Sequence, residues 1–368
     1  MRHAIGLSAV IAISSVALAN PESAKAPPQA APQAAGPQQQ AAPPQPAKSP
    51  GSLSETAKLL EPIQVESLTL TPIVTTKQKV DDEKLLVLDE AMPKKLVRIH
   101  EMDDEDVNNL TLTNKSEQPL FLLAGEVIIG GKQDRIIGRN TIVPPKKTLS
   151  VPVFCVEHGR WDNKTKEFTT AKALAHGRLR GSANFDTQSD VWKEVAAKNE
   201  LRKTTSSTDT YRKVATQQSD GTLAKWEKQV DTALGKLGDA DKAKLVGFAV
   251  SLNGKVATVD VFDNPTLFKK LQGKLVRSYI TEAIDVKKEK NIKAPTTKDV
   301  TDFIADAEKA QEEDAYSTDL ADTRTKKGSK SAKARVMYKA SKSAGAGAAD
   351  AAPAAAEGKA VFESYQAR

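Results

Sequence analysis

The segment 126–161 concentrates the side chains that could bind a charged ligand or take part in catalysis. It holds three cations, Lys132, Arg135 and Arg160, that could hold a phosphate or carboxylate, because an arginine offers such a group two parallel N–H donors. The preceding Gly130-Gly131 pair would let backbone N–H groups approach the same anion. A bulged hairpin with solvated charges is the structural alternative. A Walker A loop is excluded, because the glycine spacing does not fit and Gln133 replaces the required Ser or Thr.

Glu126 and Glu157 are the candidate catalytic residues, as a pair of carboxylates for general acid–base chemistry. By the two-residue period of a strand, Glu157 shares a face with apolar residues, where a carboxylate must be paired or have a raised pKa. The structural alternative is an internal bond from Glu157 to Arg135 or Arg160. An enzyme would need four side chains to converge in one concave pocket: Glu126, Lys132, Arg135 and Arg160.

Cys155 is the only cysteine, which excludes an internal disulfide and a four-cysteine metal site. As a nucleophile it would need a base. On a continuous strand His158 would point to the opposite face, and His176 would have to return through the fold. We therefore expect a buried structural thiol. Glu157, His158 and His176 match no recognised ligand spacing, so neither a metal nor a cofactor is predicted.

Two aromatic residues and an acidic run each allow a functional and a structural interpretation. Trp161 and Trp192 could stack on a base or sugar, or serve packing in a chain that is only 5% aromatic. With Lys132, Gln133, Arg135 and Arg160 they complete the predicted ligand-binding set. The acidic run 101–106 lacks the periodic oxygen ligands and central glycine of a calcium loop, so we expect a solvated turn.

The chain of 368 residues carries a formal net charge of +7. Charges of both signs are mixed along it, so no nucleic-acid partner is predicted. Residues 1–19 are expected to be a signal peptide, with a short basic start, an apolar run and a small-x-small end. That run is short for a membrane-spanning helix, although an uncleaved anchor is the alternative. We expect export to the bacterial periplasm or outside the cell, without a transmembrane helix in the mature chain.

Composition and pattern then predict one α+β domain over residues 53–340, after a disordered Pro/Ala/Gln-rich linker at 20–52. In 60–152, short β-branched or apolar runs alternate with turn residues. They indicate an antiparallel, β-rich N-terminal half that is sandwich- or barrel-like. Helices are expected over 188–202 and 223–237, and the second of them is followed by a hairpin and a further helix. The C-terminal half is therefore predicted to be helix–hairpin–helix.

Local turn and cap chemistry supports the later elements. Asn253-Gly254 suits a type I′ hairpin turn, and Asn264-Pro265 suits a helix start. A further helix is expected from 300 to about 316, and a strand at 335–338. Residues 341–358 are predicted to be a flexible Ala/Gly-rich loop, and 359–368 a possible terminal strand of the same domain.

Several motifs occur together in a characteristic order. They are Leu88-Asp-Glu-Ala91, the Gly-Glu and Gly-Gly-Lys-Gln-Asp-Arg runs of 125–135, the Pro-Val-Phe-Cys-Val-Glu-His-Gly-Arg-Trp run of 152–161, Gln188-x-x-Val-Trp192, Val259–Asn264 and Leu275–Tyr279. In these motifs the chain resembles the ARG and rhodanese-phosphatase-superfamily-associated protein domain family, where ARG denotes ADP-ribosylglycohydrolases. Asp134 departs from the Asn associated with the family. The resemblance covers about residues 60–300 and implies a loose link to ADP-ribose or NAD-derived chemistry, with no assigned activity.

Three functions are open at this level. The favoured one is a non-catalytic ligand- or protein-binding domain that uses 126–161 as its recognition surface. The second is a hydrolase-type enzyme for an ADP-ribose, NAD-derived or other phosphate-bearing substrate, with Glu126 or Glu157 as its base. The third is an envelope-associated structural protein, suggested by the Pro/Gln spacer. The expected partner is a small anionic ligand or an envelope protein.

Overall fold

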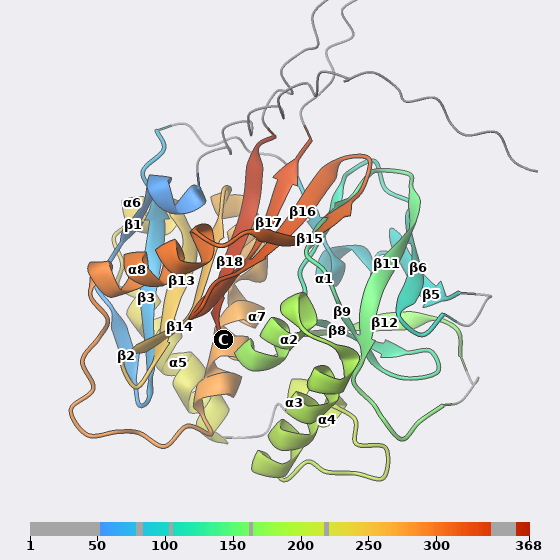
Figure 1. Cartoon of the computed structure of the whole chain (residues 1–368), viewed down its shortest axis with the longest axis horizontal. Helices are drawn as coiled ribbons and strands as arrows, with labels where there is room; N and C mark the ends of the chain where they lie inside the picture. Colours follow the sequence, from blue (N-terminus) through green and yellow to red (C-terminus); the bar gives the residue numbers. More distant parts are fainter. Residues whose placement is uncertain (1–51, 79–83, 103–105, 162–164, 217–220, 340–357) are drawn as a thin grey trace, which may run out of the picture. The chain divides into compact units, whose positions relative to one another are not determined.

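A computed structural model describes residues 52–78, 84–102, 106–161, 165–216, 221–339 and 358–368 (Figure 1). The expected signal peptide, the linker up to residue 51 and most of the Ala/Gly-rich loop lie outside the described residues. The strands are β1 (Ala57–Leu59), β2 (Ile63–Val65), β3 (Leu68–Thr75), β4 (Leu86–Val87), β5 (Val97–Glu101), β6 (Asn109–Asn114), β7 (Leu120–Leu122), β8 (Glu126–Gly130), β9 (Arg135–Ile137), β10 (Thr141–Val143), β11 (Thr148–Cys155), β12 (Phe168–Leu174), β13 (Leu245–Leu252), β14 (Lys255–Phe262), β15 (Glu312–Ser317), β16 (Ala321–Lys327), β17 (Ser331–Tyr338) and β18 (Ala360–Ala367).

Most of the helices lie between β12 and β13 or between β14 and β15 in the sequence. They are the 3₁₀ turn η1 (Leu53–Thr56) and the α-helices α1 (Leu88–Ala91), α2 (Gly177–Phe185), α3 (Gln188–Leu201), α4 (Arg212–Thr216), α5 (Gly221–Gly235), α6 (Asp239–Ala243), α7 (Pro265–Ala283) and α8 (Thr297–Glu308). The chain is therefore α+β, with a β-rich, mainly antiparallel N-terminal half.

The largest sheet has nine strands in the order β1-β3-β13-β14-β18-β17-β16-β15, with β2 also paired to β3. Its pairings are antiparallel, and β3 from the start of the domain lies directly beside β13. The last strand, β18, occupies the residues at which a terminal strand was expected and lies between β14 and β17. Both ends of the described chain thus contribute to one sheet.

Helices cover both faces of this sheet (Figure 1). On one face α5 and α7 pack through a core that includes Trp226, Leu271 and Leu275. On the other face α8 packs through Val300 and Ile304. Alternate strand residues point to the two faces, so a strand covered on both sides reads as a nearly continuous apolar run, as β13 does.

The second main body is a half-barrel of six strands in the order β12-β8-β9-β11-β6-β5. Its edge strands meet at one end, where the Glu101 amide donates to the Lys166 carbonyl at 2.9 Å. The concave side is filled by apolar residues such as Ile99, Ile137 and Val153, and α2, α3 and α4 cover the other side. A small sheet, β10-β7-β4, carries the one parallel pairing among the described strands, β4 with β7.

The turn and cap signalled at Asn253-Gly254 and Asn264-Pro265 are confirmed, and α3 has a cap of its own. Thr187 caps α3 in a capping box with Asp190. Asn253 and Gly254 take φ values of 48° and 81° in the β13–β14 turn, as a type I′ turn requires. The Asn264 side chain accepts from the first amides of α7, which has proline at its start.

One expected element is wrong, and one strand expected from the short apolar runs is shorter than its run. The helix expected to reach residue 316 ends at Glu308, and β15 follows it. This strand is an exposed sheet edge, rich in acidic residues, so it lacks the apolar alternation that signals a strand. The strand expected over Leu85–Leu88 is only Leu86–Val87, after which α1 begins. The C-terminal half also contains β15 to β18, a four-strand extension beyond the hairpin.

Candidate functional site

The β8–β9 hairpin positions most of the predicted ligand-binding residues, and its two glycines serve packing. Gly130 and Gly131 have φ values of 132° and 52°. A Cβ at Gly130 would collide with the Glu167 backbone, and one at Gly131 with the Phe168 ring. Gly130 donates its N–H to Asp134 Oδ1 at 3.2 Å, and Gly131 to the Glu167 carbonyl at 3.1 Å. The backbone anion site expected here is therefore occupied by the chain's own acceptors.

Asp134, which is fully buried, holds two arginines at the end of this hairpin. Its carboxylate accepts from Arg212 Nε at 2.8 Å and Nη2 at 2.6 Å, and from Arg160 Nη2 at 3.3 Å. Arg160 Nε also donates to Glu157 Oε2 at 2.8 Å. The internal Glu157–Arg160 bond, the structural alternative for both residues, is thus present. Glu157, a candidate base, is held in an ion-pair network with Asp134 beside it.

Glu126, the other candidate base, belongs to a separate buried cluster. Its Oε2 accepts from the Leu123 amide at 2.9 Å, and its Oε1 accepts from Lys274 Nζ of α7. Lys274 also contacts Asp89 Oδ2 of α1 at 2.9 Å. Burial raises the pKa of Glu126, while the nearby Lys274 charge opposes that rise. This cluster ties α1, β8 and α7 together.

The predicted aromatic residues lie apart from each other and from Glu126. Lys132 Nζ stands 4.8 Å from the centre of the Trp161 ring, and that ring is 53% exposed. Trp192 on α3 packs edge-on against His158 at 4.7 Å between ring centres. Trp192 therefore contributes to packing between α3 and the segment after β11, whereas the Trp161 ring is half exposed with Lys132 over it.

Neither histidine considered as a base for Cys155 contacts it in the part of the chain that the structure describes. Cys155 is buried at the end of β11, and burial raises the pKa of its thiol, which disfavours the reactive thiolate. His158 packs on Trp192, and His176 lies in a buried cluster with Tyr211, whose hydroxyl is 2.8 Å from His176 Nδ1. Within the described ranges, no group of three or more His, Cys, Asp or Glu side chains could hold a metal ion.

Arg135 differs from the other buried arginines. It is 0% exposed, and its Nη1 donates to Gln133 Oε1 at 3.0 Å. Its Nε and Nη2 find no acceptor among the described residues. Five other buried cations contact a carboxylate: Arg180 with Asp260, Lys198 with Asp285, Lys274 with Glu126, and Lys333 and Arg335 with Glu363. A buried charge without a counterion is costly, so Arg135 marks a place where an acceptor is missing.

Arg135 lies at one end of the half-barrel with three other polar residues. It pairs across the strands with Cys155, which points to the same face. Glu101, expected in a solvated turn, is instead only 5% exposed, because the edges of the half-barrel meet at this residue. We call Glu101, Gln133, Arg135 and Cys155 the barrel-end cluster. Glu101, Gln133 and Cys155 have exposed fractions of 5%, 6% and 5%, whereas Arg135 has none, so the cluster lies directly beneath the surface.

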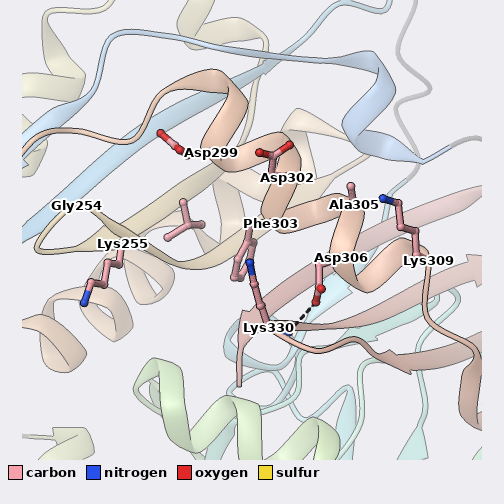
Figure 2. A pocket seen from close by; sticks show the side chains of 10 residues that line it. Gly254, Lys255, Asp299, Asp302, Phe303, Ala305, Asp306, Lys309 and Lys330 are labelled. Carbon is pink, nitrogen blue, oxygen red and sulfur yellow. Dashed lines mark hydrogen bonds between the residues drawn. The ribbon is translucent and has the colours of Figure 1, made fainter.

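A groove of 620 Å³ lies elsewhere, beside α8 and the β13–β14 turn (Figure 2). None of the predicted site residues lines it. Its acidic side chains already have partners: Asp299 caps α8, Asp302 pairs with Lys298, and Asp306 accepts from the Lys330 and Ser331 amides. With lysines on its rim as well, the groove has balanced charges and satisfied polar groups, so we assign it no chemistry.

The four side chains that an enzyme would require do not form one constellation. Glu126 is bound to Lys274, Arg160 to Glu157 and Asp134, Lys132 lies over Trp161, and Arg135 points into the half-barrel end. Three partners were missed from the sequence: Asp89, Arg212 and Lys274. For Lys274 a signal existed, because it falls on the apolar helical face of α7 with Leu271 and Ser278, where a lysine needs a buried carboxylate.

Comparison with known proteins identifies the family. The model described as "ARG and Rhodanese-Phosphatase-superfamily-associated Protein domain" matches residues 56–345. Since this is most of the chain, the protein belongs to that family, as the motifs had indicated. No curated protein and no solved structure matches the chain. In the part of the chain that the structure describes, no helix is both long and apolar enough to cross a membrane.

Proposed function

We propose that this family member is a non-catalytic domain that binds a small anionic ligand through Arg135. One observation carries the proposal: the fully buried guanidinium has two N–H groups, Nε and Nη2, without an acceptor among the described residues. A carboxylate or phosphate can accept from these two donors side by side. A hydrogen bond to a charged group contributes about 1.5–3 kcal/mol, so a ligand acceptor would offset much of the cost of burying Arg135.

The hydrolase alternative is less well supported by the same contacts. Both candidate bases, Glu126 and Glu157, are held by cations of the chain itself. A general base must reach the proton it abstracts, and each of these carboxylates would first have to break its ion pair. The cations that would clamp a phosphate point to different places. The segment from α5 through the β13–β14 hairpin to α7, the proposed helix–hairpin–helix unit, then serves as scaffold and supplies Lys274.

A thermal-shift titration of the purified protein tests this function. The ligands are acetate, succinate, inorganic phosphate, ADP-ribose and NAD, each raised stepwise in concentration. A ligand at a hundred times its Kd adds about 2.7 kcal/mol of stability, which we expect to raise Tm by about 5 °C. Arg135→Met should abolish the shift. Arg98→Met is the matched control, because Arg98 is an exposed arginine of β5 paired with Glu167 and the same charge is lost.

Two outcomes would contradict the proposal. One is a shift that Arg135→Met leaves unchanged. The other is the absence of a shift with every anion, which would favour the envelope-associated structural role. Capture of this protein with envelope components would then be the next measurement. Turnover of ADP-ribose or NAD by the wild type, lost in Glu126→Gln, would instead favour the hydrolase.

We also propose that the protein is exported, to the periplasm or outside the cell. The support is the apolar run of residues 1–19 with its small-x-small end, followed by a Pro/Gln-rich stretch. A buried Cys155 suits an oxidising compartment, because it is shielded from oxidants. N-terminal sequencing of the protein from fractionated cells tests this. A chain beginning at Asn20 is expected, whereas one that keeps Met1 would contradict cleavage.

A further inference from the structure

Glu101 is the second charged group of the barrel-end cluster without an ion-pair partner. Its Oε1 accepts from the Lys132 amide at 2.7 Å, and this bond brings the carboxylate to the β8–β9 hairpin. No lysine, arginine or histidine of the described residues forms an ion pair with it, although its side chain is 95% covered by its surroundings. The cluster thus holds one buried cation and one buried anion.

Both charges lie close to one thiol. Burial raises the pKa of Cys155, and within that environment Arg135 acts to lower it and Glu101 to raise it. Arg135 is the cross-strand neighbour of Cys155. Glu101 continues the inward-facing side of β5 beyond Ile99, which belongs to the core inside the half-barrel. The two charged groups therefore face the same end of the half-barrel.

The two groups do not neutralise each other directly. Arg135 has no carboxylate partner among the described residues and keeps two N–H groups without acceptors. A simple anion at Arg135 would supply an acceptor but would add a second negative charge near Glu101. Like charges in a largely desolvated place repel strongly, because the effective dielectric constant there is low. A molecule with an anionic and a cationic end avoids this repulsion and provides a partner for each residue.

We propose that the ligand is a small zwitterion, with a carboxylate bound by Arg135 and an ammonium group bound by Glu101. The inference rests on the proposed function, since it assigns the ligand class for the same site. Arginine suits the planar carboxylate through paired N–H donors. Glu101 offers a carboxylate to the ammonium group, and the Gln133 side-chain oxygen is already bound to Arg135. Polyanions such as nucleotides are disfavoured by Glu101.

Calorimetric titration of the full chain with matched compounds tests the ligand class. The probes are unbranched ω-amino acids of two to six carbons, each compared with the monocarboxylate of the same carbon number. We expect one amino acid length to bind at least ten-fold more tightly than its matched monocarboxylate. The preferred length would report the separation of the two charges that the site accommodates.

Two substitutions separate the roles of the charges. Glu101→Gln keeps the size of the side chain and its acceptor for the Lys132 amide. This variant should bind the amino acid and its matched monocarboxylate with about equal affinity, so the ten-fold preference is lost. Arg135→Met should abolish binding of both compound classes. Glu167→Gln is the matched control, since it removes an exposed carboxylate near the same sheet edge and should leave the preference unchanged. Circular dichroism confirms that each variant is folded.

The outcomes distinguish the two proposals. If monocarboxylates bind as tightly as the amino acids, and Arg135→Met abolishes both, the zwitterion inference is overturned while the anion-binding function stands. The zwitterion inference is likewise overturned if Glu101→Gln leaves the preference intact. If no carboxylate of either class binds the folded wild type, the zwitterion inference is overturned, and the anion-binding function then depends on phosphate binding through Arg135. If binding persists in Arg135→Met, both proposals fail.

Discussion

Replacing Arg135 by Met should stabilise the ligand-free protein, whereas the same replacement at Arg180 should destabilise it. Arg135 is 0% exposed and Arg180 is 1% exposed. Arg180 donates Nη1 and Nη2 to the two oxygens of Asp260 at 2.9 and 3.3 Å, and Tyr279 donates its hydroxyl to the same carboxylate at 2.5 Å. Among the described residues, Arg135 has the neutral Gln133 side chain as its one acceptor. The two positions therefore differ in partner, with burial held constant.

The expected magnitudes follow from these partners. Removing a buried guanidinium without a counterion relieves a desolvation cost of several kcal/mol and loses one hydrogen bond, so Arg135→Met should raise the free energy of unfolding by about 1–4 kcal/mol. Arg180→Met leaves Asp260 buried and unpaired, which should cost about 3–5 kcal/mol. Methionine fills comparable apolar space with little demand on shape.

Urea unfolding followed by tryptophan fluorescence measures both changes. The protein is first unfolded and refolded by dialysis, which removes any bound ligand, and the midpoints and slopes are compared at pH 7. Opposite signs for the two variants support the view that Arg135 lacks an acceptor in the ligand-free state. A loss of about 3 kcal/mol or more in Arg135→Met, the size expected for a paired buried charge, would refute that view and the function built on it.

Three further predictions concern the residues around the candidate site. Lys274→Met should lower the free energy of unfolding by about 3 kcal/mol at pH 8. The loss should be smaller at pH 5, because burial raises the pKa of Glu126 and removing the opposing Lys274 charge raises it further, so the carboxyl takes up a proton. Lys270→Met, which breaks a half-exposed pair on the same helix, should cost only about 1 kcal/mol and is the control for these urea titrations. Asn264→Ala should cost about 1 kcal/mol, measured in the same way, because α7 loses its cap. Burial lowers the pKa of His176 below its usual 6.5, so the unfolded chain binds this proton first and the free energy of unfolding falls as the pH drops below 6.5. His176→Gln should therefore lose less stability than the wild type between pH 7 and 5.5. An equal loss in both proteins would contradict this role of His176.

Local chemistry made several elements predictable from the sequence. Asn253-Gly254 supplies the two positive φ values of the hairpin turn, and Asn264 caps a helix whose first residue needs no N–H donor. The short β-branched runs between residues 67 and 154 mark strands at nearly their observed bounds. These signals depend on neighbouring residues, so a single sequence contains them.

The distribution of strands over sheets was not predictable in the same way. The pairing of β3 with β13 joins Leu70 to Val250, and no local pattern encodes such a distant register. The strands β15 and β16 are charged and partly exposed, so they carry no apolar alternation. Two partners in the candidate region are distant too, since the sequence separation is 148 for Glu126 and Lys274 and 78 for Asp134 and Arg212.

The position of Arg135 supports a functional origin for its unpaired charge. The long-range buried ion pairs each join separate elements: Glu126–Lys274 joins β8 to α7, and Asp260–Arg180 joins β14 to α2. Such pairs can specify how elements assemble, because a wrong arrangement leaves each charge unpartnered. Within the part of the chain that the structure describes, Arg135 joins no distant element, since its one acceptor there is two residues away. The strand β9 is already paired with β8 and β11 through the backbone. The fold therefore gains no assembly contact from this guanidinium and still bears the free-energy cost of its burial. Binding an acceptor from outside the chain, at the half-barrel end, is the role that fits Arg135.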